Sequence, residues 1–263
     1  MRAFLIAVCL GAVLAGCRQS GKADHIQIAG STAFGPTADK LAKAYIAKHP
    51  GVRIDIQANG SMVGINSAKD GTADIGMADI PELPPEAQGL KSVIVAKDGI
   101  AVVVHPSNAA GDLTLEQVGK IFSGAITNWK DLGGPDHAIT AIVRENSSGT
   151  RKSFDKILGI TGKVPKTLIS YDSNGSIRTA VANDPHAISY VTIALVDKSV
   201  KPLKIAGVEP KNENVVAGKY PISRPVFLLT RGEPQLLTKA YIDFAMSPEG
   251  QKIISDDGLI PVK

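Results

Sequence analysis

The chain has 263 residues, a formal net charge of +4 at pH 7 and only two cysteines. This length fits one large domain or two of ordinary size, with an ample hydrophobic core. The positive excess is too small to argue for a nucleic-acid-binding protein. It is compatible with a small anionic ligand but does not by itself show one.

The N-terminal residues resemble the signal of a bacterial lipoprotein. Arg2 is followed by an apolar run that is too short to span a bilayer and ends in LAGC, Leu14 to Cys17. In lipoproteins with this lipobox the chain is cut before the cysteine, whose sulfur then carries diacylglycerol. We therefore predict a signal peptide over residues 1–16 and lipidation at Cys17. The alternative is an ordinary signal peptide with an incidental cysteine.

Cleavage before Cys17 has consequences for the mature chain. Cys9 leaves with the signal, so we expect a fold without a disulfide, although its compartment permits one. The mature chain would also lack a thiol nucleophile and a cysteine metal site. Residues 17–24 are polar and contain glycine, and we expect them to form a lipidated tether between membrane and fold.

The mature sequence alternates between strand-like and helix-like patterns. Strands are predicted at HIQIAG, VRIDIQA, ADIGMAD, GIAVVVHP, AITAIV, AISYVTIALV and PVFLLT. Helices are predicted between them, one of which begins with a capping-box pattern at Thr114 and Gln117. This alternation predicts an α/β architecture with largely parallel sheets. The strands near Val102 and Val226 are the candidates for chain crossings between two domains.

Four segments place small or hydroxyl residues between a predicted strand and a predicted helix. They are AGSTAFGP (29–36), NGSMVG (59–64), DIGMAD (74–79) and RENSSGT (144–150). A helix N-terminus has unpaired backbone N–H groups and about half a positive charge, so several such ends together could bind an anion. Taken singly, each hydroxyl is better explained as a helix cap, and Arg144 as part of a surface ion pair.

Asp79 is informative because a carboxylate is out of place in an anion site. It can accept a hydrogen bond from a protonated oxyanion such as HPO₄²⁻ or H₂PO₄⁻, whereas sulfate near pH 7 has no proton to donate. A buried polar site can reject such a mimic by roughly 10⁴–10⁵-fold. Standing alone, Asp79 would be explained as a solvated acid at a strand end.

The order of these motifs resembles the phosphate-binding (PstS-like) components of bacterial ABC importers. The resemblance runs through GST, GS, DIGMAD, FSGAITNWKDLGGPD, VRENSSGTR, YPISRPVFLLT and AMSPEGQKII. It implies the type II periplasmic-binding-protein fold, in which two α/β lobes enclose phosphate in a cleft and bind it without a metal or other cofactor. We expect lobe I to comprise residues 25–102 and 225–263, and lobe II residues 103–224.

The resemblance also implies a role for each matching residue. The ligand-binding residues would be Thr32, Ala33, Ser61, Asp79, Arg144, Ser148, Gly149 and Thr150. Hydroxyl and backbone N–H groups would be the donors. Asp79 would be the acceptor that selects a protonated ligand. Arg144 would be the cation, binding through its guanidinium fork.

One departure from the family pattern concerns the neighbours of Arg144. The family often has an acid two residues after this arginine, where it orients the side chain. Here that position is Asn146, preceded by Glu145. We expect Asn146 or Glu145 to take over the orienting role. The departure leaves the affinity open and, to a lesser degree, the identity of the ligand.

An enzyme is the main alternative class. The histidines lie in no recognisable catalytic motif, and G-x-S-x-G, HExxH and P-loop sequences are absent. No spacing of histidine and acidic residues suggests a metal centre. We therefore expect no catalytic residue, and a phosphate-ester hydrolase is the weaker alternative.

The sequence thus predicts a lipid-anchored, extracytoplasmic binding protein for inorganic phosphate that delivers its ligand to an ABC permease and its ATPase. We expect a monomer without a nucleic-acid partner. Two alternatives keep the fold. The ligand could be another tetrahedral oxyanion, with arsenate ahead of sulfate or molybdate, or the protein could report phosphate to a sensor.

Overall fold

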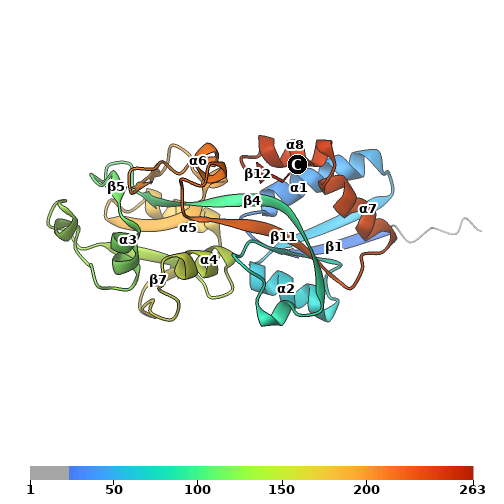
Figure 1. Cartoon of the computed structure of the whole chain (residues 1–263), viewed down its shortest axis with the longest axis horizontal. Coiled ribbons are helices and arrows are strands. Elements are labelled where there is room, and N and C mark those ends of the chain that lie inside the picture. Colours follow the sequence, from blue (N-terminus) through green and yellow to red (C-terminus); the bar gives the residue numbers. More distant parts are fainter. Residues whose placement is uncertain (1–23, 263) are drawn as a thin grey trace, which may run out of the picture.

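The computed structural model describes residues 24–262, so the predicted signal peptide, Cys17 and the tether up to residue 23 lie outside the described residues. Within this range the chain forms two α/β halves that share one curled sheet (Figure 1). We call these halves lobe I and lobe II. None of the helices in this range combines the length and apolar character that a membrane crossing requires.

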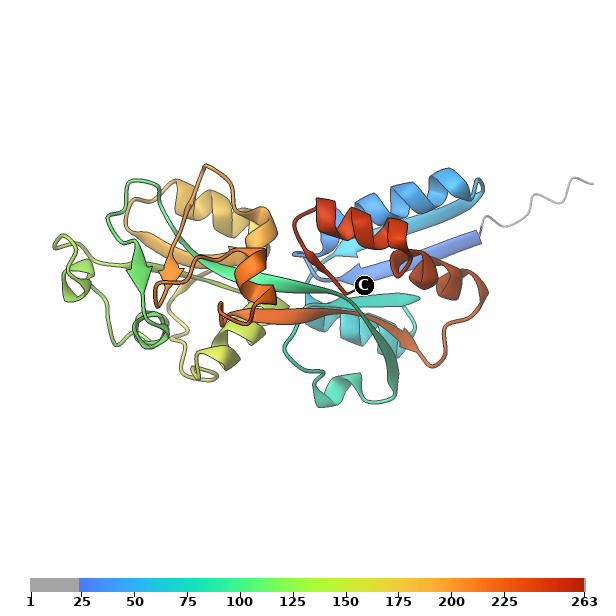
Figure 2. The same cartoon turned by 45° about the horizontal axis from the view of Figure 1, so that its top comes forward.

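Lobe I contains both ends of the described chain. Its own elements are β1 (Asp24–Gly30), α1 (Gly35–Lys48), β2 (Val52–Ala58), α2 (Ser61–Asp70), β3 (Ile75–Ala78), the 3-10 turn η1 (Pro85–Ala87), α7 (Leu236–Ala245), α8 (Pro248–Asp256) and β12 (Ile260–Pro261). β1 pairs in parallel with both β2 and β3. Helices α1, α7 and α8 pack on one face of the sheet and α2 on the other, as Figure 2 shows. The lobe therefore has three layers, with a core on each side of the sheet.

Lobe II repeats this layering with different elements. They are β5 (Asp112–Leu113), α3 (Leu115–Phe122), η2 (Trp129–Leu132), β6 (Thr140–Arg144), α4 (Gly149–Ile157), β7 (Ile169–Tyr171), α5 (Asn174–Ala182), β8 (Ala187–Thr192), η3 (Ile193–Leu195), β9 (Lys201–Pro202), β10 (Lys204–Ile205) and α6 (Asn212–Val216). Helices α3 and α4 share one core, in which Phe154 stacks on Tyr190 at 3.9 Å and meets Phe122 edge to face at 5.0 Å. Helix α5 packs in the core on the other side.

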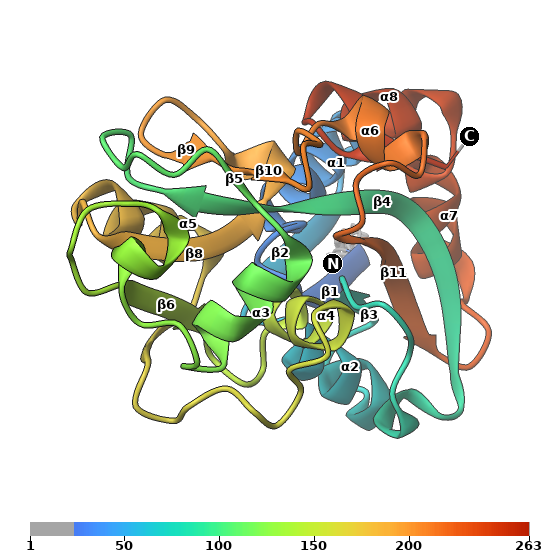
Figure 3. The same ribbon diagram turned by 60° about the vertical axis from the view of Figure 1, so that its left-hand side comes forward.

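Two long strands join the lobes. They are β4 (Leu90–Val104) and β11 (Ser223–Arg231), and Figure 3 shows the long ribbon of β4 passing from one half to the other. In lobe I the two strands pair with each other in antiparallel register, and in lobe II β4 pairs with β8. The strands predicted as chain crossings are these two. The residue limits predicted for the lobes stay a prediction.

The sheet differs from the sequence-based expectation in one respect. It is mixed rather than largely parallel, because β4 and β11 run against their neighbours β3 and β8 as they pass between the lobes. β4 also begins at Leu90, well before the apolar run that starts at Gly99. The sequence did not predict its first half, because that half is partly exposed and carries polar side chains. The strand predicted through Val196 ends at Thr192.

The capping box predicted at Thr114 and Gln117 is present, whereas α1 and α2 begin without a side-chain cap. The Thr114 hydroxyl accepts the N–H of Gln117 at 3.1 Å, and the Gln117 amide oxygen accepts the N–H of Thr114 at 2.8 Å. Pro36 lies in the first turn of α1, where its missing N–H costs no helical hydrogen bond. Of these two helix starts, that of α1 belongs to the candidate site, and that of α3 does not.

Candidate functional site

Four helices begin close together where the two lobes meet. Ser61, the first residue of α2, packs against Gly149, the first residue of α4. Asn174, the first residue of α5, donates from Nδ2 to the hydroxyl of Thr32 at 3.2 Å, in the turn that leads into α1. Each helix start carries unpaired N–H groups and a partial positive charge. The junction between the lobes is therefore rich in backbone donors.

Asp79 lies at the centre of the lobe I side, directly after β3. Its side chain is 2% exposed, and the Ser61 hydroxyl donates to its Oδ1 while accepting its backbone N–H at 3.1 Å. The other oxygen, Oδ2, lies 2.5 Å from Nη2 of Arg224. That contact is an ion pair without hydrogen-bond geometry, and Oδ2 has no hydrogen-bond partner among residues 24–262. Asp79 therefore keeps capacity to accept a further hydrogen bond.

The turn between β1 and α1 is held together from within. The buried hydroxyl of Ser31 accepts the N–H groups of Ala33 and Phe34, each at 3.1 Å. The N–H of Ala33 thus already has a partner inside the turn. The neighbouring hydroxyl of Thr32 faces lobe II, where it meets Asn174. Thr32 is therefore the member of this turn that makes a contact between the lobes.

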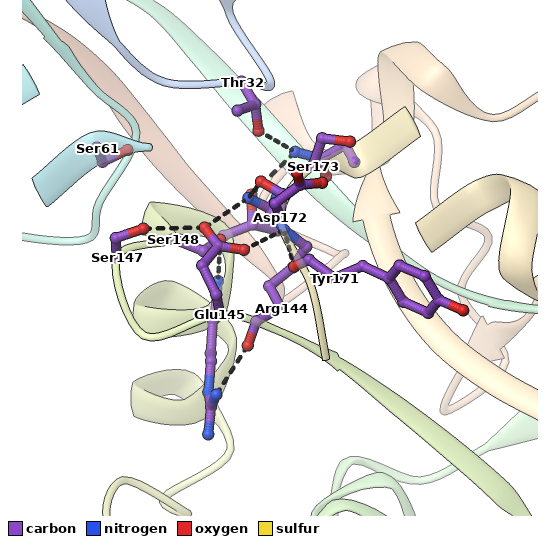
Figure 4. Close-up of polar contacts among 12 residues, drawn as sticks. Thr32, Ser61, Arg144, Glu145, Ser147, Ser148, Tyr171, Asp172 and Ser173 are labelled. Atoms are coloured by element: carbon purple, nitrogen blue, oxygen red, sulfur yellow. Dashed lines mark hydrogen bonds and ion pairs between the residues drawn. The ribbon is translucent and has the colours of Figure 1, made fainter. Parts of the chain in front are cut away.

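Arg144 ends β6 and is 1% exposed. Its Nε donates to Glu145 Oε2 at 3.1 Å and to the carbonyl of Tyr171 at 3.2 Å. Its Nη2 donates to Glu145 Oε1 at 3.0 Å and to the carbonyl of Asp172 at 2.8 Å (Figure 4). Its Nη1 has no hydrogen-bond partner among the described residues. A buried charged donor of this kind costs free energy unless something accepts its hydrogens.

The structure separates the two candidates for orienting Arg144. Glu145 forms the fork with Arg144 and also accepts the hydroxyl of Ser147 at 3.0 Å, as Figure 4 shows. Asn146 is exposed and lines a groove of about 570 Å³ between residues 80–85 and α4. Glu145 is therefore the residue that holds the guanidinium in place, and Asn146 is not.

The start of α4 brings the lobes into direct contact. Ser148 caps the helix by accepting the N–H of Arg151 at 3.2 Å, and Thr150 lies next to Asn174, with Nδ2 and Oγ1 separated by 3.5 Å. A Cβ on Gly149 would stand 2.5 Å from Asp79 Oδ1 and closer still to the hydroxyl of Ser61. Only glycine allows this approach without displacing one of the two.

Further hydrogen bonds join the lobes beside this contact. The N–H of Met62 in α2 donates to the carbonyl of Ser147 at 3.1 Å, and the hydroxyl of Ser153 in α4 donates to the carbonyl of Asp79 at 3.3 Å. Gly60 has φ +105° and packs against Ser147, so it combines left-handed backbone with a close approach. The structure thus has its lobes closed on each other at the predicted site.

Three buried polar residues of this region were missed by the sequence reasoning. Asn174 is fully buried and links Thr32 and Thr150 to the N–H of Thr192, which donates to its Oδ1 at 3.3 Å. Asp98 and Arg224 form an ion pair in which Nη2 and Oδ2 are 2.7 Å apart. An arginine beside a proline in an otherwise apolar strand was the available signal for Arg224. Asn174 offered none beyond its place after a capping serine.

Burial shifts the acid–base properties of one of these residues. The pKa of Asp98 is raised above its ordinary value by burial, and the charge of Arg224 and the hydroxyl of Thr192 offset part of that rise. Asp79, Asp98, Arg144 and Arg224 together give two acids and two cations, each at most 2% exposed. The charges in this buried group balance when all four are ionised.

The structure brings the predicted residues to one place. Ser61, Asp79 and Gly149 are in direct contact, Thr32 and Thr150 are joined through Asn174, Arg144 and Ser148 belong to the turn that precedes Gly149, and Ala33 follows Thr32. Their roles toward a ligand stay predictions. Within residues 24–262, no group of three or more His, Cys, Asp or Glu side chains is placed to hold a metal ion.

Comparison with known proteins gives consistent matches over most of the chain. Residues 18–249 match the family model described as a PBP superfamily domain. The phosphate-binding protein PstS of Bacillus subtilis (strain 168) is 36% identical over 242 residues, which are 90% of this chain and 80% of that protein.

Solved structures agree with this match. A putative phosphate ABC transporter substrate-binding protein from Clostridium perfringens, with bound phosphate, superimposes with a TM-score of 0.88 at 40% identity, over 91% of this chain and 100% of the other. An ABC-type phosphate transport receptor from Vibrio cholerae superimposes with a TM-score of 0.77 at 36% identity, over 89% and 99% of the two chains. The fold is the type II periplasmic-binding-protein fold, as the sequence predicted.

Proposed function

The chain belongs to the PstS family of phosphate-binding proteins within the PBP superfamily, and on this premise we propose that it captures inorganic phosphate between its lobes and delivers it to an ABC transporter. It is an extracytoplasmic binding component of such a transporter. The observation that carries the assignment of the site is the buried Nη1 of Arg144, which has no partner among the described residues.

Phosphate fits this position because both lobes present donors to it. Arg144 would bind one oxygen through Nη1, while Glu145 and two backbone carbonyls keep the guanidinium from turning. The start of α4, with Ser148, Gly149 and Thr150, would add hydroxyl and backbone donors. From lobe I the hydroxyl of Thr32, the N–H of Ala33, and the backbone N–H and hydroxyl of Ser61 would complete the shell. To donate to the ligand, the Ser61 hydroxyl would have to give up its hydrogen bond to Oδ1 of Asp79. The N–H of Ala33 would then exchange its partner Ser31 for the ligand.

Asp79 gives the site its choice of ligand. Its Oδ2 keeps free acceptor capacity, so a protonated oxygen of HPO₄²⁻ or H₂PO₄⁻ can donate to it. Sulfate carries no proton near neutral pH, and its oxygen would face the carboxylate without a hydrogen bond. A site of this kind can discriminate by roughly 10⁴–10⁵-fold.

Ligand capture and delivery follow from the contacts between the lobes. A ligand held by donors of both lobes stabilises the closed arrangement, because only there are all the donors within reach. The contacts of Met62 with Ser147 and of Ser153 with Asp79 would add to that stabilisation. A permease that recognises surfaces of both lobes would then accept the loaded protein in preference to the empty one.

Titration calorimetry tests the function. We expect phosphate to bind the wild-type protein at micromolar or lower concentration, arsenate to bind similarly because it shares charge, protonation and shape, and sulfate and molybdate to bind far more weakly. Asp79→Asn should narrow the gap between phosphate and sulfate, since an amide can donate to an unprotonated oxygen. Absence of phosphate binding, or equal binding of sulfate, would contradict the proposal.

Membrane attachment and assembly form the finer part of the proposal. We expect Cys17 to carry the lipid and the protein to act as a monomer without turnover of phosphate esters. Mass spectrometry of the N-terminal peptide would identify the modified cysteine, and Cys17→Ser should release the protein from the membrane fraction. A phosphomonoesterase activity that is lost in Ser148→Ala would instead indicate an enzyme.

A further inference from the structure

Arg224 is a second buried arginine beside the site, and the ligand shell does not use it. Its side chain is 0% exposed, and β11 carries it to the crossing between the lobes, directly opposite Asp98 of β4. Nη2 lies 2.5 Å from Oδ2 of Asp79 and 2.7 Å from Oδ2 of Asp98. One nitrogen therefore contacts two acids, one directly after β3 and the other in β4.

The two buried arginines are used in different ways. Arg144 directs Nε and Nη2 into hydrogen bonds that fix the plane of its fork. Arg224 makes a hydrogen bond only through Nη2 to Asp98, and its Nε and Nη1 have no partner among the described residues. Its effect on Asp79 is therefore that of a nearby charge. Such a cation favours the ionised form of a carboxyl, which burial alone would drive toward the protonated form.

We propose that Arg224 is a specificity-determining residue, which keeps Asp79 ionised and thereby restricts the site to oxyanions that carry a proton. The inference rests on the proposed function. An ionised Asp79 can only accept a hydrogen bond, so the ligand must supply the proton. A protonated Asp79 would itself be a donor, and an unprotonated oxyanion such as sulfate could accept from it.

The surroundings make Arg224 the main control on Asp79. Ser61 of α2 and Gly149 and Ser153 of α4 also contact Asp79, and none of them carries a charge. The charged groups that face it are Arg224 of β11 and, through that arginine, Asp98 of β4. The arginine cannot easily turn away, since it is buried and held by Asp98, which also accepts the hydroxyl of Thr192 from lobe II.

Arg224→Met tests the inference by titration of phosphate and sulfate at pH 6 and pH 8. From a wild-type preference for phosphate of roughly 10⁴-fold, we expect a fall of about 100-fold or more, with phosphate bound more weakly and sulfate more tightly. The sulfate gain should be larger at pH 6, because it requires a proton on Asp79. Arg224→Lys keeps the charge and should retain the preference within about tenfold.

A purely structural role would give a different result. Phosphate and sulfate would then weaken by the same factor at both pH values, and that outcome would overturn the inference. In an Asp79→Asn background the change at Arg224 should no longer alter the ratio of the two affinities. A further fall of the ratio in that background would also contradict it.

Two safeguards keep the test decisive. If Arg224→Met does not fold, Arg224→Met combined with Asp98→Asn avoids leaving Asp98 as an unpaired buried charge. The same loss of preference is expected there, and an unchanged preference overturns the inference. If the wild-type protein itself fails to bind phosphate, the proposed function falls. If the wild type binds phosphate selectively and the variants keep that selectivity, only the role of Arg224 falls.

Discussion

The two lobes build their sides of the site in different ways. On lobe II, Arg144 to Thr150 form one continuous turn, and the arginine is fixed by its neighbour Glu145 and by the carbonyls of Tyr171 and Asp172. On lobe I, the site residues come from three separate turns, two of which supply donors and one the acceptor Asp79. Asp79 depends on Ser61 from one of these turns and on an arginine from the crossing strand.

This difference predicts a division of labour. A continuous turn around a fixed cation attracts any suitable anion, so lobe II should determine affinity. An acid whose protonation depends on distant residues decides which anion is accepted, so lobe I should determine selectivity. Variants on the two sides should therefore separate the two properties.

Removal of the Arg144 guanidinium should have the largest effect. Arg144→Met deletes the charged donor, and loss of one partner of a buried charged contact typically costs about 2–5 kcal/mol, or roughly 30- to several thousand-fold in affinity. We expect phosphate, arsenate and sulfate to weaken together in calorimetric titrations, with their ratios nearly unchanged.

A matched control for Arg144 lies in the same lobe. Arg178 pairs with Asp197 and donates to the carbonyl of Leu195 at 3.1 Å, and neither partner belongs to the site. Arg178→Met should leave phosphate affinity within about twofold of wild type. If Arg144→Met bound phosphate as tightly as this control does, the role of Arg144 as the site's cation would be wrong.

Gly149→Ala should have the next largest effect, because it acts where the two lobes touch. The added Cβ would stand 2.5 Å from Asp79 Oδ1, and Asp79 and Ser61 are both buried and cannot move aside easily. We expect a loss of roughly 10- to 100-fold in phosphate affinity. Small-angle scattering should show less contraction on addition of phosphate than in wild type.

Two observations distinguish this effect from a loss of folding. Gly149 is the first residue of α4 and its backbone φ is not positive, so alanine introduces no backbone strain there, and the thermal stability of Gly149→Ala without ligand should not fall. Gly111→Ala is a suitable control, since nothing lies within 4 Å of its Cβ position. A Gly149→Ala protein that contracts and binds like wild type would show that closure does not require this contact.

The site residues of lobe II were easier to predict from the sequence than those of lobe I. The turn from Arg144 to Thr150 is contiguous, so its residue types and their order predict a cation beside a capped helix. The resemblance to a known family then implied the role of each residue. The choice between Asn146 and Glu145 as the residue that orients Arg144 needed coordinates, because both are close to the arginine along the chain. Arg224 and Asn174 were missed because their partners are far away in sequence, with Asn174 and Thr32 separated by 142 positions.

The fold shows the same limit. Helix caps and buried strands carry local signals and were predicted, whereas the antiparallel course of β4 and β11 was not. Their direction is decided by how the chain returns between the lobes, and neither strand encodes that locally. The sequence reasoning therefore failed at pairings between distant residues. This holds both for the sheet and for the contacts around Asp79 in lobe I.

Glu145→Gln should weaken phosphate binding by about three- to tenfold. The amide can accept one of the two guanidinium hydrogen bonds that the carboxylate accepts, and the two carbonyls still hold Arg144. Loss of a negative charge near the anion offsets part of this cost. The paired variant Asn146→Asp should bind phosphate within about twofold of wild type, because Asn146 is exposed on the outer groove. Equal or tighter binding by Glu145→Gln would show that the carbonyls alone orient the arginine.

The smallest expected effect concerns Arg151 and Asp155 of α4, the first of which contacts the lobe II turn. Arg151 donates from Nη1 to the carbonyl of Arg144 at 2.7 Å, and its Nε lies 3.4 Å from Asp155, whose side chain is 13% exposed. Burial raises the pKa of Asp155 to about 6, against the opposing charge of Arg151. In the folded protein Asp155 therefore takes up a proton at a higher pH than in the unfolded chain. Its contribution to stability consequently falls as pH rises from about 4 to about 6.

Asp155→Asn cannot ionise and should remove this pH dependence. Relative to wild type, its free energy of unfolding should rise by about 1–2 kcal/mol between pH 4.5 and pH 7.5, because each pKa unit corresponds to about 1.4 kcal/mol and part of the change lies below pH 4.5. Urea titrations of both proteins at the two pH values measure this difference in unfolding free energy, from which the contributions of other titrating groups cancel.

The phosphate affinity of Asp155→Asn should stay within about threefold of wild type, since Arg151 still donates to the carbonyl of Arg144. A stability difference that is the same at both pH values would mean that Asp155 ionises freely. A large loss of affinity would mean that the turn of lobe II depends on this acid and is less self-contained than its contacts indicate.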